Sequence, residues 1–248
     1  MNNSEISLDG VSLSFRLYHD RNVSLKEKFA NMLSRRKVAG PTEFWALSDV
    51  NLKIEHGERV GIVGHNGAGK STLLKTICRI YEPTRGAVNV QGRIAPLLEI
   101  GAGFQPEVSG RQNIYLNGAI LGYPTSVLKE IEREIIEFTQ MEEFIDMPVK
   151  YYSTGMYMKL AFAIATAVKP DILILDELFA GGDAEFIERA RARMQKFVDN
   201  SSILVFVSHQ ESLIEQLCNR VIWVDHGRVV MDGATSEVLQ SYLGKSRG

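Results

Sequence analysis

A glycine-rich stretch at residues 64–71, Gly-His-Asn-Gly-Ala-Gly-Lys-Ser, constrains this chain more than any other part of the sequence. An apolar run at 59–63 leads straight into it, and residues 71–80 after it have helical spacing of apolar side chains. Glycines allow backbone N–H groups to converge on an anion, and the following helix points its positive N-terminal end at the same place. The pattern G-x-x-x-x-G-K-[ST] between a strand and a helix therefore predicts a phosphate-binding loop.

The loop supplies most of the candidate nucleotide contacts. Lys70 adds a full positive charge at the β- and γ-phosphates, and the hydroxyl of Ser71 is a candidate ligand for Mg²⁺. His65 is expected to leave its side chain in solvent. The remaining candidates for contact with ATP are Gly64, His65, Asn66, Gly67, Ala68, Gly69 and Thr72.

A second element, residues 172–177, reads Ile-Leu-Ile-Leu-Asp-Glu. Four apolar residues predict a strand buried on both faces, and the two carboxylates follow at its C-terminal end, where α/β sheets place their chemistry. We expect Asp176 to hold Mg²⁺, directly or through water, and Glu177 to act as the general base toward the attacking water.

The rest of the chain fits one α/β architecture. Strands are expected at 6–15, 45–55, 58–63, 172–175 and 203–207, and helical segments at 126–146 and 156–168. Helical runs alternate with the buried strands, so the sequence predicts a mostly parallel central sheet covered by helices. The 248 residues, 45% of them apolar, suit one large domain with a helical subdomain.

Composition and charge argue against some functions. A net charge of −2 gives no basic surplus for nucleic-acid binding, so no nucleic-acid partner is expected. The two cysteines, Cys78 and Cys218, are expected to be buried thiols in a reducing compartment. The N-terminal residues 1–10 lack a signal-peptide core, and the most apolar run, 160–168, is too short to span a bilayer. A cytoplasmic protein is expected.

Three further motifs narrow the class. Residues 151–156, Tyr-Tyr-Ser-Thr-Gly-Met, resemble a divergent form of the ABC signature, with Ser153 and Gly155 kept. Residues 207–209, Val-Ser-His, resemble the switch-histidine motif, and residues 180–183, Ala-Gly-Gly-Asp, resemble the dimer-contact loop after the catalytic glutamate. Together with the phosphate loop, these motifs identify the chain as similar to the ATP-binding subunits of ABC transporters, with a P-loop fold, an antiparallel β subdomain and a helical subdomain.

The resemblance implies roles for several residues. Ser153, expected at the N-cap of the helix 156–168, and Gly155 would cap the γ-phosphate bound to Lys70 of a second copy, so a homodimer is implied. His209 would contact the γ-phosphate. The glutamine that normally reaches Mg²⁺ is missing, and Glu99 is the expected replacement. Phe15 matches the place of the adenine-stacking aromatic, with Tyr18 and Trp45 as contenders.

The details resemble ATPase subunits that export bacterial cell-surface polysaccharides, especially lipid-linked O-antigen, with teichoic acid and capsule exporters as relatives. The residues that carry this resemblance lie at 24–27, 99–104, 110–118, 151–156 and 182–186. It implies ATP hydrolysis at the cytoplasmic face of the bacterial inner membrane, with an integral membrane permease as partner. A groove near 99–118 would receive that permease, which would itself carry the lipid-linked polysaccharide.

The same resemblance suggests how the chain is divided. Residues 16–44 would be a family-specific insertion, 106–168 the helical subdomain and 225–248 the end of the motor, all within one domain of 1–248. The basic segment 24–38 is either a solvated surface insertion or a segment that lies against anionic headgroups or a membrane partner. Some exporters of this branch carry an additional C-terminal β-sandwich; a cap-independent exporter and a shortened chain both stay open.

Three alternatives remain. A soluble ABC ATPase acting on nucleic acid or ribosomes would usually carry two motors or long coiled coils, and neither pattern is present here. A small-molecule P-loop kinase would share Lys70 and Ser71 but needs no signature motif. An ABC exporter of a drug, another lipid or teichoic acid would share every motif described above.

Overall fold

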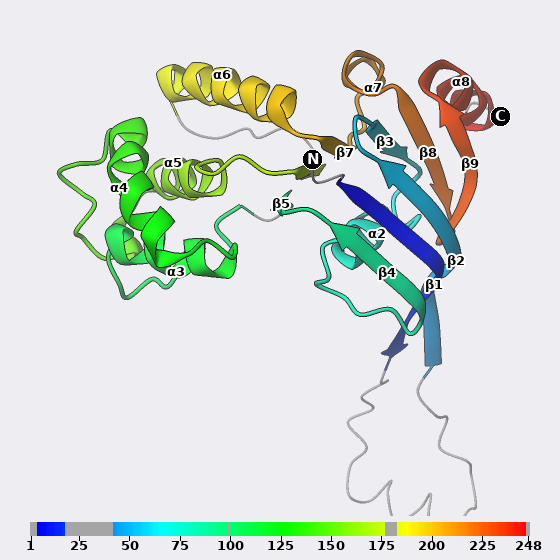
Figure 1. Ribbon diagram of the computed structural model, residues 1–248, viewed down its shortest axis with the longest axis horizontal. Coiled ribbons are helices and arrows are strands. Elements are labelled where there is room, and N and C mark those ends of the chain that lie inside the picture. The colour runs from blue at the N-terminus through cyan, green and yellow to red at the C-terminus, as the bar shows by residue number, and fades with distance from the viewer. Residues whose placement is uncertain (1–3, 18–41, 99, 177–182, 247–248) are drawn as a thin grey trace, which may run out of the picture.

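The computed structural model describes residues 4–17, 42–98, 100–176 and 183–246, which form two β-sheets flanked by helices (Figure 1). The smaller sheet has the strand order β2-β1-β4, and both pairings in it are antiparallel. Its strands are β1 Glu5–Leu17, β2 Thr42–Glu55 and β4 Arg85–Gln91. Burial alternates in the second half of β2, which turns Val50, Leu52 and Ile54 to the core and leaves the residues between them exposed.

The larger sheet carries the strands that the sequence predicted to be buried. Its order is β5-β6-β7-β3-β8-β9, with parallel pairing throughout except between β8 and β9. The strands are β3 Arg59–Val63, β5 Ile94–Leu97, β6 Ile172–Asp176, β7 Ile203–Val207, β8 Arg220–Asp225 and β9 Arg228–Ala234. All five residues of β7 are buried, as a strand covered on both faces requires.

One short helix joins the two sheets. Helix α2, Lys70–Ile77, places Leu73, Leu74 and Ile77 in an apolar cluster that also contains residues of β1, β2, β3 and β6. The helix that follows the glycine-rich loop is therefore fixed by packing on both sheets, and so is the direction in which its N-terminus points.

The remaining helices form two groups. Helices α3 Gly110–Ile120, α4 Thr125–Thr139 and α5 Thr154–Ala165 share their own apolar cluster and lie to one side of the sheets (Figure 1). Helices α6 Ala184–Asn200, α7 Glu211–Leu217 and α8 Thr235–Ser246 connect or follow the last strands of the larger sheet. A short 3-10 turn, Val149–Tyr151, precedes α5. The predicted α/β fold with an antiparallel β subdomain is confirmed.

One predicted helix boundary was wrong, and two strands are longer than expected. The helical segment expected over 126–146 ends at Thr139, because Gln140 has a left-handed backbone (φ 55°) and Met141 and Ile145 then turn into the core. Strands β1 and β2 extend into the expected insertion 16–44, pairing Arg16 with Glu43 and Leu17 with Thr42. Residues 18–41, which include the basic segment 24–38, lie outside the described residues.

The described part of the chain bears on two expectations, the lack of a membrane-spanning segment and the burial of the two cysteines. None of the helices there combines the length and apolar character that crossing a bilayer needs. Both cysteines are free; Cys218 is buried and Cys78 is partly buried, so the prediction of two buried thiols holds fully for Cys218 only. Burial raises the pKa of each thiol to about 12, which keeps both protonated at neutral pH.

Candidate nucleotide-binding site

The glycine-rich loop connects β3 to α2 and depends on its glycines for conformation. Gly64, Gly67 and Gly69 have φ angles of 154°, 81° and 106°, where a side chain is strained. A Cβ atom on Gly64 would lie 2.2 Å from the carbonyl oxygen of Val224. Within the loop, Ala68 is buried, while Asn66 and Gly67 are exposed. Only glycine at 64 lets the loop pass this close to β8.

The turn between β8 and β9 supports the loop from below. The backbone N–H of Gly227 donates to the carbonyl of Ala68 at 2.8 Å, and the N–H of Ser48 donates to the carbonyl of Gly227 at the same distance. The loop is thus tied through one residue to both sheets. At its far end α2 begins with Gly69 as N-cap and no capping side chain, which leaves the first N–H groups of the helix available to an anion.

Lys70 is 7% exposed and lies across the loop. Its Nζ donates to the carbonyl oxygen of Gly64 at 2.7 Å and to that of His65 at 3.1 Å. The ammonium group is thereby held inside the ring of backbone atoms that the sequence predicted to surround phosphate. Ser71 and Thr72 follow it in the first turn of α2.

The structure brings Ser71 and Asp176 together across 105 residues of sequence. The Ser71 hydroxyl donates to Oδ2 of Asp176 at 3.4 Å. Two ligands that occupy neighbouring corners of an octahedron around Mg²⁺ lie roughly 3 Å apart, given metal–oxygen distances of 2.0–2.1 Å. This pair of oxygen atoms could therefore hold one divalent cation beside the loop, as the sequence predicted.

Strand register places His209 at the same edge. Val207, the last residue of β7, is the register partner of both Asp176 on β6 and Ile62 on β3. His209 follows two residues later and is exposed. The carboxyl ends of β3, β6 and β7 therefore bring the loop, the carboxylate and the histidine to one edge of the parallel sheet. The predicted role of His209 toward the γ-phosphate stays a prediction.

Ser153 is the N-cap of α5, as predicted, and its hydroxyl accepts a hydrogen bond from the N–H of Met156 at 3.2 Å. The Ser153 side chain is exposed and Gly155 is half-buried. Figure 1 shows α5 among the helices to one side, well apart from α2 and the phosphate loop. Within one chain, the structure therefore does not bring Ser153 and Gly155 to Lys70.

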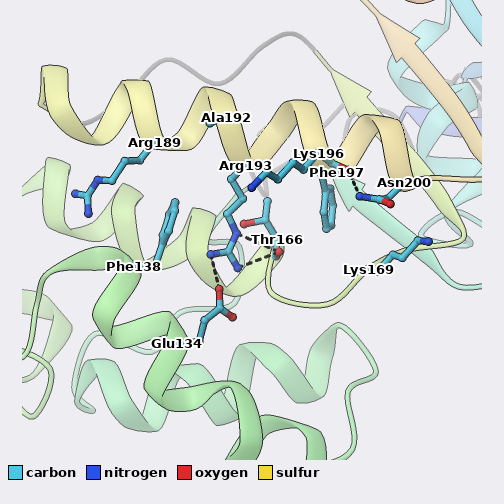
Figure 2. A pocket seen from close by; sticks show the side chains of 10 residues that line it. All are labelled: Glu134, Phe138, Thr166, Lys169, Arg189, Ala192, Arg193, Lys196, Phe197 and Asn200. Atoms are coloured by element: carbon cyan, nitrogen blue, oxygen red, sulfur yellow. Dashed lines mark hydrogen bonds and ion pairs between the residues drawn. The ribbon is translucent and has the colours of Figure 1, made fainter.

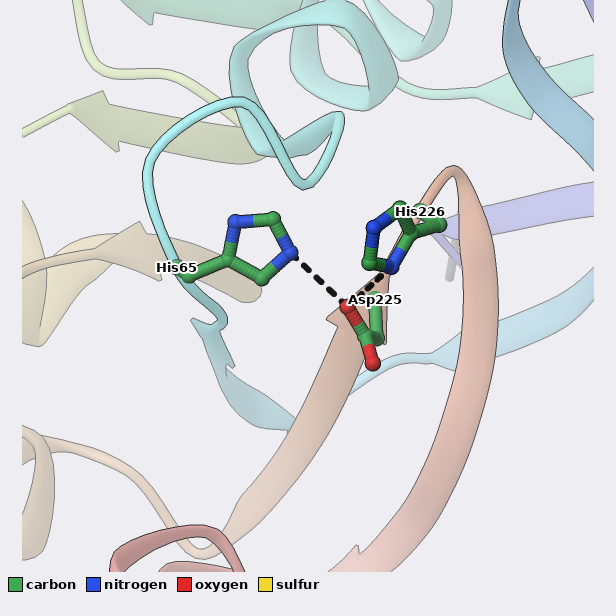
Figure 3. A group of neighbouring side chains, drawn as sticks. All are labelled: His65, Asp225 and His226. Atoms are coloured by element: carbon green, nitrogen blue, oxygen red, sulfur yellow. Dashed lines mark hydrogen bonds and ion pairs between the residues drawn. The ribbon is translucent and has the colours of Figure 1, made fainter. Parts of the chain in front are cut away.

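His65 is exposed, as expected, but its ring also has two polar neighbours. Its Nε2 lies 2.8 Å from Oδ1 of Asp225, and its Nδ1 lies 2.7 Å from the carbonyl oxygen of Asn66 (Figure 3). Each ring nitrogen therefore faces one hydrogen-bond acceptor. Half of the His65 side chain remains accessible (49%), and the ring still borders solvent.

Asp225 is the centre of this network. His226 Nδ1 lies 2.7 Å from Oδ1, and Lys245 of α8 lies 3.2 Å from Oδ2. Burial pushes the pKa of Asp225 up, but the hydrogen bonds from Lys245, His65 and His226 outweigh it and hold the pKa below its usual range. His65, Asp225 and His226 bring ligand atoms within 4.8 Å of one another, but the Lys245 ammonium on the same carboxylate opposes a metal cation there.

The sequence did not single out Asp225, His226 or Tyr157. The Tyr157 hydroxyl donates to the carbonyl of Gly101 at 2.7 Å, which ties the helix that carries Ser153 to the segment after β5. Gly101 has a φ of 87°, and a Cβ atom there would lie 2.6 Å from the Tyr157 ring. A tyrosine followed by apolar residues reads as an ordinary helix face, so only the fold reveals this link.

The adenine-stacking residue stays a prediction. Phe15 is half-buried and packs edge-on against Tyr81, with ring centroids 5.5 Å apart. The guanidinium of Arg85 lies 5.0 Å from the centroid of the Trp45 ring. Glu177, the predicted general base, Glu99, the predicted metal ligand, and Tyr18 lie outside the described residues.

Comparison with known proteins gives the family. The profile described as ABC transporter matches residues 47–180. An O-antigen export system ATP-binding protein of Klebsiella pneumoniae is 36% identical over 237 residues, which cover 96% of each chain. One of Yersinia enterocolitica is 39% identical over 88% of this chain and 93% of its own. One of Myxococcus xanthus is 49% identical over 197 residues, and this match spans only 45% of that relative's length.

Solved structures show the same fold. A dimeric ATP-binding cassette in a post-hydrolysis state with ADP and Pi matches with a TM-score of 0.65 at 20% identity, over 93% of this chain and 98% of the other. An ATP-binding subunit of an ABC transporter matches with a TM-score of 0.66 at 22% identity, over 96% of this chain and 92% of its own. With the loop, the Ser71–Asp176 pair and the signature helix in place, the chain belongs to the ABC transporter family of ATP-hydrolysing proteins, in the group of O-antigen export system ATP-binding proteins.

Proposed function

We propose that this chain hydrolyses ATP to drive export of a lipid-linked polysaccharide, O-antigen in the first instance, across the bacterial inner membrane. The observation that carries the proposal is similarity along nearly the whole chain, 36–39% over 88–96% of it, to proteins named for O-antigen export. The chain would act at the cytoplasmic face of that membrane, held there by a permease, with no nucleic acid as partner.

Hydrolysis would use the groups gathered at the sheet edge. Lys70 and the N–H groups of the loop and of α2 would bind the phosphates, and Ser71 and Asp176 would hold Mg²⁺. The metal would neutralise charge that develops on the phosphate oxygens. Glu177 would accept a proton from the attacking water, and His209 would contact the γ-phosphate.

Two copies would complete each site. The distance between α5 and the loop within one chain supports this, because Ser153 and Gly155 can cap a γ-phosphate only on another molecule (Figure 1). The nucleotide would then join two copies, and loss of the γ-phosphate would remove the charge that holds them.

A permease would dock beside α3. Leu116 and Ile120 are 43% and 67% exposed there, although both are large apolar side chains. A Cβ atom on Gly103 would lie 2.7 Å from Ile120, so this face adjoins the segment 101–105. That segment is tied to α3 by Asn117, which donates to the carbonyl of Ala102 at 2.7 Å. A coupling segment that rests here would contact residues that follow Glu99 closely in the sequence.

Teichoic acid is the second candidate cargo. A teichoic acids export ATP-binding protein of Listeria monocytogenes is 36% identical over 97% of this chain and 70% of its own length. The Klebsiella relative has the same identity to this chain. Sequence similarity therefore does not distinguish teichoic acid from O-antigen as the cargo, and a direct experiment is needed.

Glu177→Gln tests the proposal, because it keeps the groups that bind ATP and removes the base. We expect the rate of hydrolysis to fall roughly 10²–10⁴-fold. The tagged variant, expressed in its native host, is isolated from detergent-solubilised membranes with ATP present. One polytopic membrane protein should co-purify, and lipid-linked glycan should build up in the cells and identify the cargo.

Glu188→Gln serves as the matched control, since this exposed side chain on α6 makes the same chemical change outside the site. It should give neither the loss of hydrolysis nor the build-up of glycan. Recovery of ribosomes, nucleic acid or only soluble proteins with Glu177→Gln would overturn the export assignment and leave the ATPase chemistry intact.

A further inference from the structure

The two ends of helix α5 are held in different ways. Residues 160–165 are all buried, whereas residues 153–159 are exposed or only partly buried. Arg193 of α6 also ties down the end of the helix, because it donates to the carbonyl of Thr166 at 3.1 Å and to Oε1 of Glu134 on α4 at 2.8 Å (Figure 2). The beginning of α5, which carries the signature motif, therefore depends on side chains that reach out from it.

Tyr157 is the side chain that ties this beginning to the segment 101–105. Its backbone N–H donates to the carbonyl of Ser153 at 2.9 Å, so the N-cap and Tyr157 belong to one turn. Its hydroxyl donates to the carbonyl of Gly101 at 2.7 Å. Its ring packs against that of Phe104, with the centroids 4.9 Å apart. The first turn of α5 thus has a polar and an apolar contact with the segment after β5.

The backbone at Gly101 leaves room for the tyrosine ring. The φ angle of Gly101 is 87°, which favours glycine, and its carbonyl also accepts from the N–H of Phe104 at 3.2 Å, which closes a turn. A Cβ atom at this position would lie 2.6 Å from the Tyr157 ring and 2.9 Å from its hydroxyl oxygen. A side chain at 101 would therefore displace Tyr157 and the turn of α5 that carries it.

Two buried asparagines of α3 hold the segment 101–105 from the other side. Oδ1 of Asn113 accepts from the N–H of Gln105 at 2.8 Å, and Nδ2 of Asn113 donates to the carbonyl of Gln105 at 3.0 Å. Asn117 donates to the carbonyl of Ala102 at 2.7 Å. Buried amides that pair with backbone groups in this way fix the backbone closely. The segment is therefore a firm anchor for the Tyr157 hydroxyl.

We propose that Tyr157 is a positioning residue for ATP hydrolysis, whose hydrogen bond to Gly101 sets the place of Ser153 toward the nucleotide of a second copy. This role rests on the proposed completion of each nucleotide site by two copies. Tyr157 itself would not contact the nucleotide. It would act through the first turn of α5, which presents Ser153 and the N–H groups behind it to the γ-phosphate.

Tyr157→Phe tests this role, because it removes the hydroxyl and keeps the ring against Phe104. An ion pair between Lys159 and Asp183 still holds the early part of α5, so we expect a folded protein with a displaced first turn. ADP lacks the γ-phosphate, so its binding measures the half of the site that contains Lys70, and calorimetry should give the wild-type dissociation constant. The kcat for ATP should fall roughly three- to tenfold, as loss of one hydrogen bond allows.

Gly101→Ala tests the same contact from its other partner. Its Cβ would occupy the place of the Tyr157 ring, so kcat should again fall while ADP binding stays unchanged. The two substitutions together should lower kcat by less than the product of their separate effects, since both break one contact. Gly101→Ala also strains the backbone, and Tyr157→Phe decides alone if that variant does not fold.

Tyr123→Phe is the matched control, because it makes the same substitution at a buried position between α3 and α4. It should change neither kcat nor ADP binding. A wild-type kcat in Tyr157→Phe, an equal fall in Tyr123→Phe, or a parallel loss of ADP binding in Tyr157→Phe would overturn the positioning role. Ser153→Arg, measured beside them, separates the causes. If it also hydrolysed ATP at the wild-type rate, the two-copy site would fail together with this role; if it were inactive, only the role of Tyr157 would fail.

Discussion

At the scale of single residues, the phosphate loop takes its shape from groups far away in the sequence. Gly64 is required because Val224 carries a carbonyl oxygen in the space of a Cβ, and His65 is held by Asp225, 160 residues later. These partners fix the backbone of the loop that we propose to bind the phosphates of ATP. Asp225 is the most connected of them, with contacts to the loop, to its own turn and to α8.

Asp225 gives the stability of this protein a pH dependence with a defined sign. Its pKa in the folded protein is depressed below that of an unfolded chain, about 3.9. The stabilisation from its ionised form is therefore complete above that pH, and it is lost as the pH falls through the folded pKa. We expect the difference in unfolding free energy between wild type and Asp225→Asn to be largest above about pH 5 and to shrink toward pH 3.

Urea denaturation between pH 3 and pH 7 measures this difference. Glu142→Gln is a suitable control, because it neutralises an exposed carboxylate of another segment. Its effect should vary less with pH than that of Asp225→Asn. A constant difference between wild type and Asp225→Asn over the whole range would show that the charge of Asp225 does not stabilise the fold.

At the scale of helices and strands, the sequence predicted the features that depend on neighbouring residues. It did not predict the features that depend on contacts between distant residues. The buried strands at 172–176 and 203–207 and the N-cap at Ser153 follow from apolar runs and one hydroxyl. The end of α4 at Thr139 does not, because the chain turns there to bury Met141 and Ile145 against other helices. The sequence did not predict the role of the β8–β9 turn for the same reason, because that turn supports the phosphate loop through contacts between distant parts of the chain.

Helix α3 offers a test at this scale, because it begins with a complete capping box. The Ser109 hydroxyl accepts from the N–H of Gln112 at 3.2 Å, and the Gln112 side chain accepts from the N–H of Ser109 at 3.0 Å. Ser109→Ala should lower the free energy of unfolding by about 1 kcal/mol, measured by urea denaturation. Ser109→Thr keeps the hydroxyl and should lose clearly less; equal losses would mean that packing, not the cap, determines the start of α3.

At the scale of the whole molecule, the position of α5 supports the proposal that one copy holds only part of each nucleotide site. The loop, Ser71 and Asp176 are fixed to the two sheets, whereas Ser153 belongs to a separate group of helices with its own core (Figure 1). The sequence predicted both halves from their motifs. Only the resemblance to ABC transporter subunits predicted a homodimer. No sequence pattern within one chain shows that Ser153 of one copy meets Lys70 of another.

Mixing two inactive variants tests this division directly. Lys70→Ala should abolish hydrolysis by removing the phosphate cation, and Ser153→Arg should abolish it by placing a bulky side chain where the second copy approaches. In a mixed dimer one site carries both defects and the other carries neither. Since half of randomly assorted dimers are mixed, a 1:1 mixture should recover roughly a quarter of the wild-type ATPase rate, provided that one intact site suffices.

Each variant alone at the same total concentration is the control. If the mixture stayed as inactive as its components, with mixed dimers shown to form by differential tags, Ser153 would not serve the Lys70 of another copy, and completion of each site by a second molecule would have to be abandoned.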